Sequence, residues 1–274
     1  MQIENGDHHR ARTQPPRPTS QLASLATRRV TGRQRRIWSR RVNSWDQHGS
    51  ANLGAVTSAV IASAATESGA DVVDIGCGTG QISIPLATRG ANVLGLDVSP
   101  AMARRLGAEA QRRGFQNLAA VAMPVEELDL PPASVDLVVS SYALHHLRDA
   151  DKARLVSGAF RWLRPGGQLV IADMMLGRGA SARDRAIIRS KISVLARMGP
   201  GGWWRIAKNA VRYLLRVQER PISMIAWVSL LETAGFTGVT ASAVVAETGL
   251  VAGTRPSPIG SSMAGAAGTR YGRR

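Results

Sequence analysis

Short apolar runs alternate with helically spaced apolar residues through the middle of this chain. The runs predict buried strands over residues 72–75, 92–97, 118–122, 135–140 and 168–173. The segments between them, near 80–89, 100–113 and 147–163, have the spacing of helices. Because strands separated by helices form parallel sheets with crossover helices, the pattern predicts an α/β fold with helices on both faces of the sheet.

The two ends of this pattern differ from its middle. A helical pattern runs from about residue 34 to residue 65, before the first strand. After the fifth strand, the chain predicts a helix over 222–234 and then strands over 236–245 and 248–253, joined by a short link. Strands with so short a link pair antiparallel, so we expect a C-terminal antiparallel hairpin on an otherwise parallel sheet.

An insertion, residues 177–221, separates the fifth strand from the last helix. It contains two predicted helices, about 181–198 and 202–218, divided by glycines and a proline. The second is amphipathic and basic, with Trp203 and Leu214 on its apolar side. One interpretation is a helical lid that packs on the domain. The other is a peripheral membrane contact through 202–218, or an entry gate for an apolar substrate.

Positive charge is concentrated before the first predicted helix. The formal net charge is +16, and ten arginines lie between Arg10 and Arg41. We predict a basic, disordered arm over residues 1–33, which is either simply solvated or attracts nucleic acid or anionic lipid. Residues 256–274 are rich in Gly, Ser and Ala, and we predict a flexible tail there.

The chain has one cysteine, Cys77, so no intrachain disulfide can form. Its apolar runs are all shorter than the roughly 20 residues that span a bilayer, and the N-terminal stretch lacks the apolar core of a signal peptide. These features predict no transmembrane segment and a cytoplasmic location. We find no metal-ligand spacing in the sequence.

A glycine-rich turn follows the first strand and contains Gly76, Gly78 and Gly80. Glycine tolerates positive φ and lets a ligand approach the backbone closely, and the next helix can offer its first N–H groups to an anionic group. A dinucleotide fingerprint places its third glycine one residue later. The stretch Asp74–Gly80, which reads D-I-G-C-G-T-G, instead resembles motif I of the class I S-adenosylmethionine (SAM)-dependent methyltransferases.

This resemblance implies a Rossmann-like, seven-stranded, mostly parallel sheet and an enzyme with SAM as its cofactor. It covers about 38–255, so we predict a methyltransferase domain over 34–255. Asp97 ends the second strand, where the family's acid accepts both ribose hydroxyls. The segment from Val98 to Met102 is similar to the family pattern as well. The chain looks most like the small-molecule branch, which includes ubiquinone and menaquinone methyltransferases.

The loop after the third strand departs from the family pattern. Pro124 stands where the family has an Asp that contacts the adenine amino group. By resemblance, the backbone N–H of Val125 can still bond to the adenine ring and Met123 can pack on its face. Glu126 is a possible substitute acid.

Ser140-Ser141-Tyr142 and Leu144-His145-His146 follow the fourth strand and resemble motif IV of the small-molecule branch. The resemblance places both serines beside the SAM methionine, and Tyr142 can offer a π face to the sulfonium. His145 or His146 can remove a proton from an attacking group, because histidine titrates near neutral pH. Alternatively, both histidines bond locally and cap the next helix.

Three further expectations follow from the resemblance. Trp45 covers the methionine moiety as part of a lid, or simply packs on its helix. Leu163–Leu169 forms a turn into the fifth strand. The predicted cofactor-binding set is Asp74, Gly76, Cys77, Gly78, Gly80, Asp97, Val98, Met123, Val125, Ser140 and Tyr142.

The first functional hypothesis is a methyltransferase that acts by in-line displacement on a small, perhaps apolar, metabolite. A second keeps the enzyme but takes RNA or protein as substrate, recruited by the arginine arm. A third is a SAM-binding sensor without turnover. Correct positioning for displacement is worth several kcal/mol, up to about 7–11 in the best intramolecular cases.

Overall fold

The structure is a computed structural model, which describes residues 32, 34–40, 51–177, 181–201, 203–204, 220–245 and 247–258. The predicted arm (except Gly32) and most of the tail, from residue 259 onward, lie outside these residues. So do Trp45 and most of the predicted helix 202–218.

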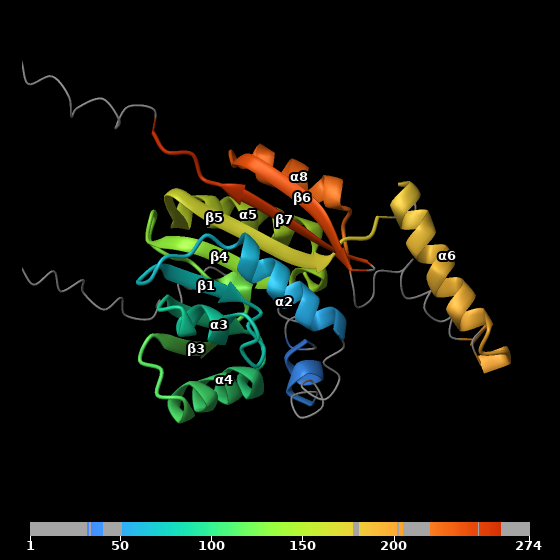
Figure 1. Ribbon diagram of the computed structural model, residues 1–274, viewed down its shortest axis with the longest axis horizontal. Helices are drawn as coiled ribbons and strands as arrows, with labels where there is room; N and C mark the ends of the chain where they lie inside the picture. Colours follow the sequence, from blue (N-terminus) through green and yellow to red (C-terminus); the bar gives the residue numbers. More distant parts are fainter. Residues whose placement is uncertain are drawn as a thin grey trace, which may run out of the picture.

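Seven strands form a single sheet in the order β3-β2-β1-β4-β5-β7-β6 (Figure 1). The first five are parallel, and β7 pairs antiparallel with both β5 and β6. The strands are β1 (Asp71–Ile75), β2 (Asn92–Asp97), β3 (Leu118–Ala122), β4 (Val135–Ser141), β5 (Leu163–Met174), β6 (Thr237–Val245) and β7 (Thr248–Thr254). The predicted mostly parallel sheet with a C-terminal hairpin is therefore confirmed.

Helices cover both faces of this sheet because successive strand residues point to opposite sides. On one face, Val72 and Val139 pack with apolar residues of α2 (Ala51–Ser63), α3 (Ser83–Thr88) and α4 (Pro100–Arg112). On the other, Val73 and Val138 pack with α5 (Asp149–Trp162) and α8 (Met224–Thr233). Each face therefore has its own apolar core.

Two element boundaries differ from the sequence prediction. α3 begins at Ser83 rather than near 80, because the glycine turn continues past Gly80. β5 begins at Leu163, which pairs with Val135, and the ladder resumes at Gln168 after an irregularity. Arg164 lies within that irregular stretch and donates to Asp71 and Asp136, at 2.9 and 2.6 Å. The predicted turn is thus incorporated into the start of the strand.

The leading helical pattern corresponds to helical residues 34–40 and to α2, and residues 41–50 between them are not described. Within the insertion, α6 (Ala182–Ala196) projects away from the sheet, beyond the carboxyl ends of the strands (Figure 1). Residues 200, 201, 203 and 204 are helical, so the predicted breaker includes a helix start at Pro200, where the fixed φ of proline is favourable.

Candidate active site

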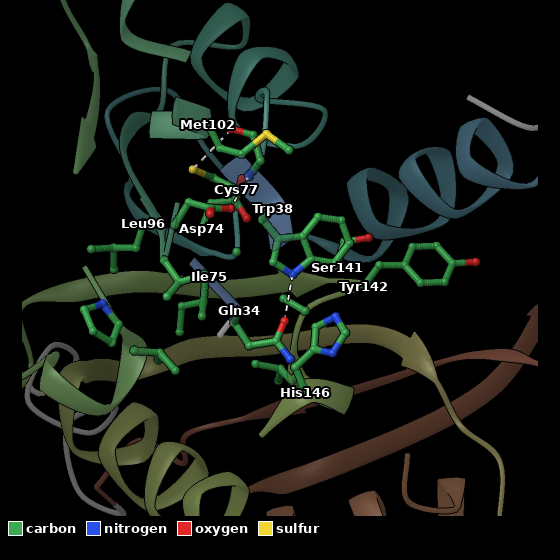
Figure 2. A pocket seen from close by; sticks show the side chains of 18 of the residues that line it. Gln34, Trp38, Asp74, Ile75, Cys77, Leu96, Met102, Ser141, Tyr142 and His146 are labelled. Atoms are coloured by element: carbon green, nitrogen blue, oxygen red, sulfur yellow. Dashed lines mark hydrogen bonds between the residues drawn. The ribbon is translucent and has the colours of Figure 1, made fainter. Parts of the chain in front are cut away.

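A cleft opens at the carboxyl ends of β1 and β4, where the direction of strand order reverses, which is the usual ligand crevice of an open α/β sheet (Figure 2). Its empty volume, including the part open to solvent, is about 1100 Å³. The loops after β1, β2, β3 and β4 contribute to it, together with the leading helix. Its lining includes Gln34, Trp38, Leu53, Asp74, Gly76, Cys77, Gly78, Asp97, Val98, Met102, Met123, Pro124, Val125, Glu126, Ser141, Tyr142, Leu144, His146 and Leu147.

The glycine turn is held against β2 by its own backbone. The N–H groups of Gly76 and Cys77 both donate to the Leu96 carbonyl, at 2.7 and 2.9 Å. The Gly78 N–H donates to Asp97 Oδ2 at 3.0 Å. These three amides are therefore already bonded within the protein. What this part of the turn can offer a ligand is therefore close approach to the backbone.

Gly76 is needed for two independent reasons. Its φ is +76°, which side chains rarely adopt, and a Cβ there would lie 2.2 Å from the Cβ of Ala143. Gly80, predicted to bind the cofactor, is not among the residues that line the cleft. A Cβ at Gly80 would lie 2.4 Å from Leu106 Cδ1, so this glycine allows the turn to pack on α4.

Cys77 lines the cleft, but its side chain is buried. A Cβ on Gly95 would lie 3.0 Å from its sulfur, so the thiol packs against β2. Burial raises the pKa of the Cys77 thiol well above its ordinary value, and the nearby Asp74 and Asp97 carboxylates add to this. The thiol is thus held protonated and packs as a small apolar group, which disfavours it as a nucleophile.

Two acids lie together in the cleft wall. Asp97 Oδ1 accepts the Ser99 N–H at 2.7 Å, and its other oxygen accepts the Gly78 N–H. A carboxylate has about four acceptor positions, so Asp97 retains capacity for ligand hydroxyls. Burial raises the pKa of Asp97. Asp74 accepts the Ser83 hydroxyl at 2.5 Å, and burial together with the Asp97 charge raises its pKa to about 7.

An apolar slot adjoins these acids. Met102, Met123 and Val125 line it, and the Met123 N–H donates to the Asp97 carbonyl at 2.9 Å. Pro124 and Glu126 line the same part of the cleft. Burial raises the pKa of Glu126, which favours its protonated, hydrogen-bond-donating form. The loop after β3 thus reaches the cleft despite its departure from the family pattern.

The structure separates the two predicted serines. The buried Ser140 hydroxyl donates to the Ile75 carbonyl at 2.8 Å and does not line the cleft, whereas Ser141 does. Tyr142 also lines the cleft, with φ of 51°, an uncommon backbone conformation for a bulky residue. Its N–H donates to the Ala172 carbonyl at 2.9 Å, and its hydroxyl pairs with Thr248 Oγ1. Contacts from β5 and β7 therefore maintain this conformation.

The two histidines have different surroundings. His145 is buried, its Nδ1 lies 2.5 Å from Asp173 Oδ1, and it does not line the cleft. His146 lines the cleft, and its ring lies edge-on to Trp38 with the centroids 5.5 Å apart (Figure 2). Both belong to the 3-10 turn η3 (Leu144–His146), and their ring centroids lie 4.0 Å apart. Of the two predicted bases, the structure brings only His146 to the cleft.

The leading helix contributes side chains that the sequence interpretation missed. Trp38 lines the cleft and donates from Nε1 to Gln34 Oε1 at 3.1 Å. Ser39 Oγ lies 2.9 Å from Ser99 Oγ, which places this helix over the loop after Asp97. The sequence signal was the apolar position of Trp38 in a helical pattern, but this spacing does not say which surface the helix covers.

Within the described ranges, no three His, Cys, Asp or Glu side chains gather closely enough to hold a metal ion. In that same part of the chain, no helix has both the length and the apolar character needed to cross a membrane.

Comparison with known proteins agrees with this geometry. Residues 72–167 match the family model described as "Methyltransferase domain", and this span runs from β1 to the start of β5. The chain is 30% identical over 142 residues to an uncharacterized methyltransferase of Geobacillus thermodenitrificans, covering 51% of this chain and 60% of that one. It is 38% identical over 107 residues to an uncharacterized methyltransferase of Synechocystis, and this match covers 39% of this chain and 48% of the Synechocystis protein. The chain thus spans about half the length of these curated relatives.

A solved methyltransferase of Haloferax volcanii, in complex with the Trm112 methyltransferase activator, superimposes with a TM-score of 0.61 and 17% identity, covering 80% of this chain and 98% of that one. A SAM-dependent methyltransferase from Aquifex aeolicus superimposes with a TM-score of 0.56 and 17% identity, and the match covers 79% of this chain and 97% of that one. At these identities the similarity establishes the fold. Together with the match of residues 72–167 to the methyltransferase family model, it shows that this chain has the Rossmann-like fold of these methyltransferases and is similar to them in sequence from β1 to the start of β5.

Proposed function

We propose that this protein transfers the methyl group of SAM to a small, largely apolar acceptor that enters the cleft beside His146. The observation that carries the proposal is the arrangement of the cleft at the β1–β4 switch point. A backbone-fixed carboxylate, Asp97, adjoins an apolar slot, and a histidine lines the same cleft. The family match over 72–167 supports the reaction class.

The chemistry of the lining suits SAM as the donor. Asp97 can accept the ribose hydroxyls, because each of its oxygens is used by only one backbone donor. Met102, Met123 and Val125 offer apolar surface to a purine. Asp74 is a buried carboxyl in the same wall, and a cationic ligand would favour its ionised form. The glycine turn allows close approach between these groups.

Bound SAM supplies a methyl group on a sulfonium, which is an activated leaving group. The protein's task is to align the acceptor with that methyl group and to exclude water. Trp38 and the leading helix cover the side of the cleft nearest His146. In this proposal His146, which lines the cleft, takes the proton that the acceptor's O–H or N–H loses as the new bond to carbon forms. His145, paired with Asp173, instead positions the loop.

The acceptor's chemistry is argued from the remaining lining. Trp38, Leu53, Leu144 and Leu147 line the same cleft as His146 with apolar surface. Pockets that are mostly apolar with a few polar groups take small molecules. We therefore favour a small metabolite over RNA or protein. The described residues add no observation in favour of the nucleic-acid alternative, since nearly all of the arginine arm lies outside them.

Two measurements test the proposal. Calorimetric titration with SAM should show binding, and Asp97→Asn should weaken it by about 1–3 kcal/mol, the scale of hydrogen bonds to a charged group. Asp129→Asn, which changes an exposed carboxylate outside the cleft, is the matched control. Incubation with isotopically labelled SAM and a metabolite extract should then give a labelled small-molecule product. SAM binding without any product would favour the sensor, and a labelled RNA or protein would favour the macromolecular substrate.

A further inference from the structure

The segment from α6 to Trp204 exposes large apolar side chains. We call this segment, residues 182–204, the α6 surface. Its members Ile192, Val194, Met198, Trp203 and Trp204 are 40%, 58%, 56%, 59% and 72% exposed. In the described part of the chain, Ile225 is the one other large apolar side chain classed as exposed. Five of these six side chains thus fall between residues 192 and 204, and such a concentration in one segment marks an interaction site, whereas scattered ones are ordinary.

The same segment is strongly basic. Residues 182–204 contain five arginines and lysines and a single acid, Asp184. That acid is buried, and its Oδ1 accepts the Gly177 N–H at 3.0 Å, so it does not offset the charge at the surface. Arg185, Arg189 and Arg197 are exposed. The α6 surface therefore presents apolar and cationic side chains together.

From this combination we propose that the α6 surface docks on an anionic lipid bilayer. Basic helices that expose Trp and aliphatic side chains bind in the plane of the interface, where the apolar groups enter the headgroup–acyl boundary and the cations meet anionic lipid. A second copy of the chain would bring the same positive charge to the contact and be repelled. RNA could pair its phosphates with the arginines and stack its bases on the tryptophans. It offers no apolar medium, however, for Ile192, Val194 and Met198.

Both ends of the insertion are fixed beside the cleft. At its start, Arg183 Nη1 donates to the Met175 carbonyl at 2.8 Å, just after β5. At its end, the Arg220 N–H donates to the His145 carbonyl at 2.6 Å, and buried Lys152 donates from Nζ to the Arg220 carbonyl at 2.7 Å. His145 directly precedes the cleft residue His146.

The docking surface and the cleft thus lie at the same edge of the sheet, which α6 extends beyond (Figure 1). A bilayer contacted by the α6 surface would lie close to the cleft and could present an apolar acceptor to it. This last step depends on the proposed methyl transfer, whereas lipid binding itself does not.

Vesicle flotation of the full chain tests the proposal. Vesicles of phosphatidylcholine mixed with phosphatidylglycerol should carry the protein, and pure phosphatidylcholine vesicles should carry much less. Trp203→Ser with Trp204→Ser should weaken partitioning by about tenfold or more, since apolar insertion is lost. Arg185→Gln with Arg189→Gln should weaken it about fivefold per arginine. Arg104→Gln with Arg105→Gln, on exposed positions of α4, makes the same charge change elsewhere and should have a much smaller effect.

The tryptophan variant also separates the α6 surface from the arginine arm, because binding through the arm would not require Trp203 or Trp204. The proposal would be overturned if the Arg104/Arg105 variant lost as much vesicle binding as the Arg185/Arg189 variant. It would also be overturned if the tryptophan variant kept full vesicle binding. Self-association or RNA binding through this surface without vesicle binding would overturn it too. SAM titration on the same preparations separates the proposed methyl transfer from the proposed membrane docking. Normal SAM binding without flotation would refute only the membrane docking.

Discussion

The buried carboxyl of Asp74 gives a stability prediction that needs no ligand. Its side chain is 1% exposed, and the Ser83 hydroxyl bonded to its Oδ2 is equally inaccessible. Burial disfavours the charged form and raises the pKa from the ordinary 3.8 to about 7, and the neighbouring Asp97 charge contributes in the same direction. The Ser83 hydrogen bond opposes this increase but does not cancel it. Ionised Asp74 therefore destabilises the folded chain.

The sign and the size follow from proton linkage. Between pH 3.8 and about 7 the folded state holds a proton on Asp74 that the unfolded state has released. Stability from this group is therefore present at low pH and is lost as pH rises through the folded pKa, by at most about 1.4 kcal/mol per pH unit. Over the whole interval the loss is about 4 kcal/mol.

The perturbation is Asp74→Asn, which keeps an acceptor for Ser83 and cannot ionise. Urea unfolding, followed by tryptophan fluorescence from pH 5 to pH 8, should show the native protein losing stability relative to this variant as pH rises. Asp129→Asn, at an exposed position, should reproduce the native slope. If the difference between the native protein and Asp74→Asn stays constant across this range, the argument from burial is wrong.

Three more predictions concern the cleft. Gly76→Ala should lower the free energy of unfolding by about 1–3 kcal/mol or more, since its Cβ would lie 2.2 Å from another Cβ, whereas Gly107→Ala, in open space on α4, should stabilise slightly in the same thermal scan. His146→Gln should lower kcat by a factor of about 10²–10⁴ with little change in SAM affinity. His145→Gln should instead lower thermal stability. If kcat fell in the His145 variant and only stability fell in the His146 variant, the proposed role of His146 as the base would be wrong. SAM binding near pH 6.5 should release protons, seen as a buffer-dependent calorimetric heat that Asp74→Asn removes.

Some features of this protein were determined by local sequence alone. The sequence pattern predicted all seven strands. For the buried ones, such as β1 and β4, the reason is that a buried strand requires consecutive apolar residues. The glycine spacing from Gly76 to Gly80 predicted a turn with positive φ, which the structure has at all three glycines. Asp97 and Val98 lie in the cleft as expected, because the carboxyl ends of parallel strands meet at one edge of the sheet.

Other features required the tertiary structure, because adjacent residues can have different partners. Ser140 bonds to β1 whereas Ser141 lines the cleft, and one 3-10 turn directs His145 to Asp173 and His146 to Trp38. Trp38 belongs to the site only because its helix packs over a loop about 60 residues away in sequence. The spacing of residues fixes which ones share a face of their own element. Which partner covers that face depends on long-range packing, and here that packing placed the histidine and left the α6 surface exposed.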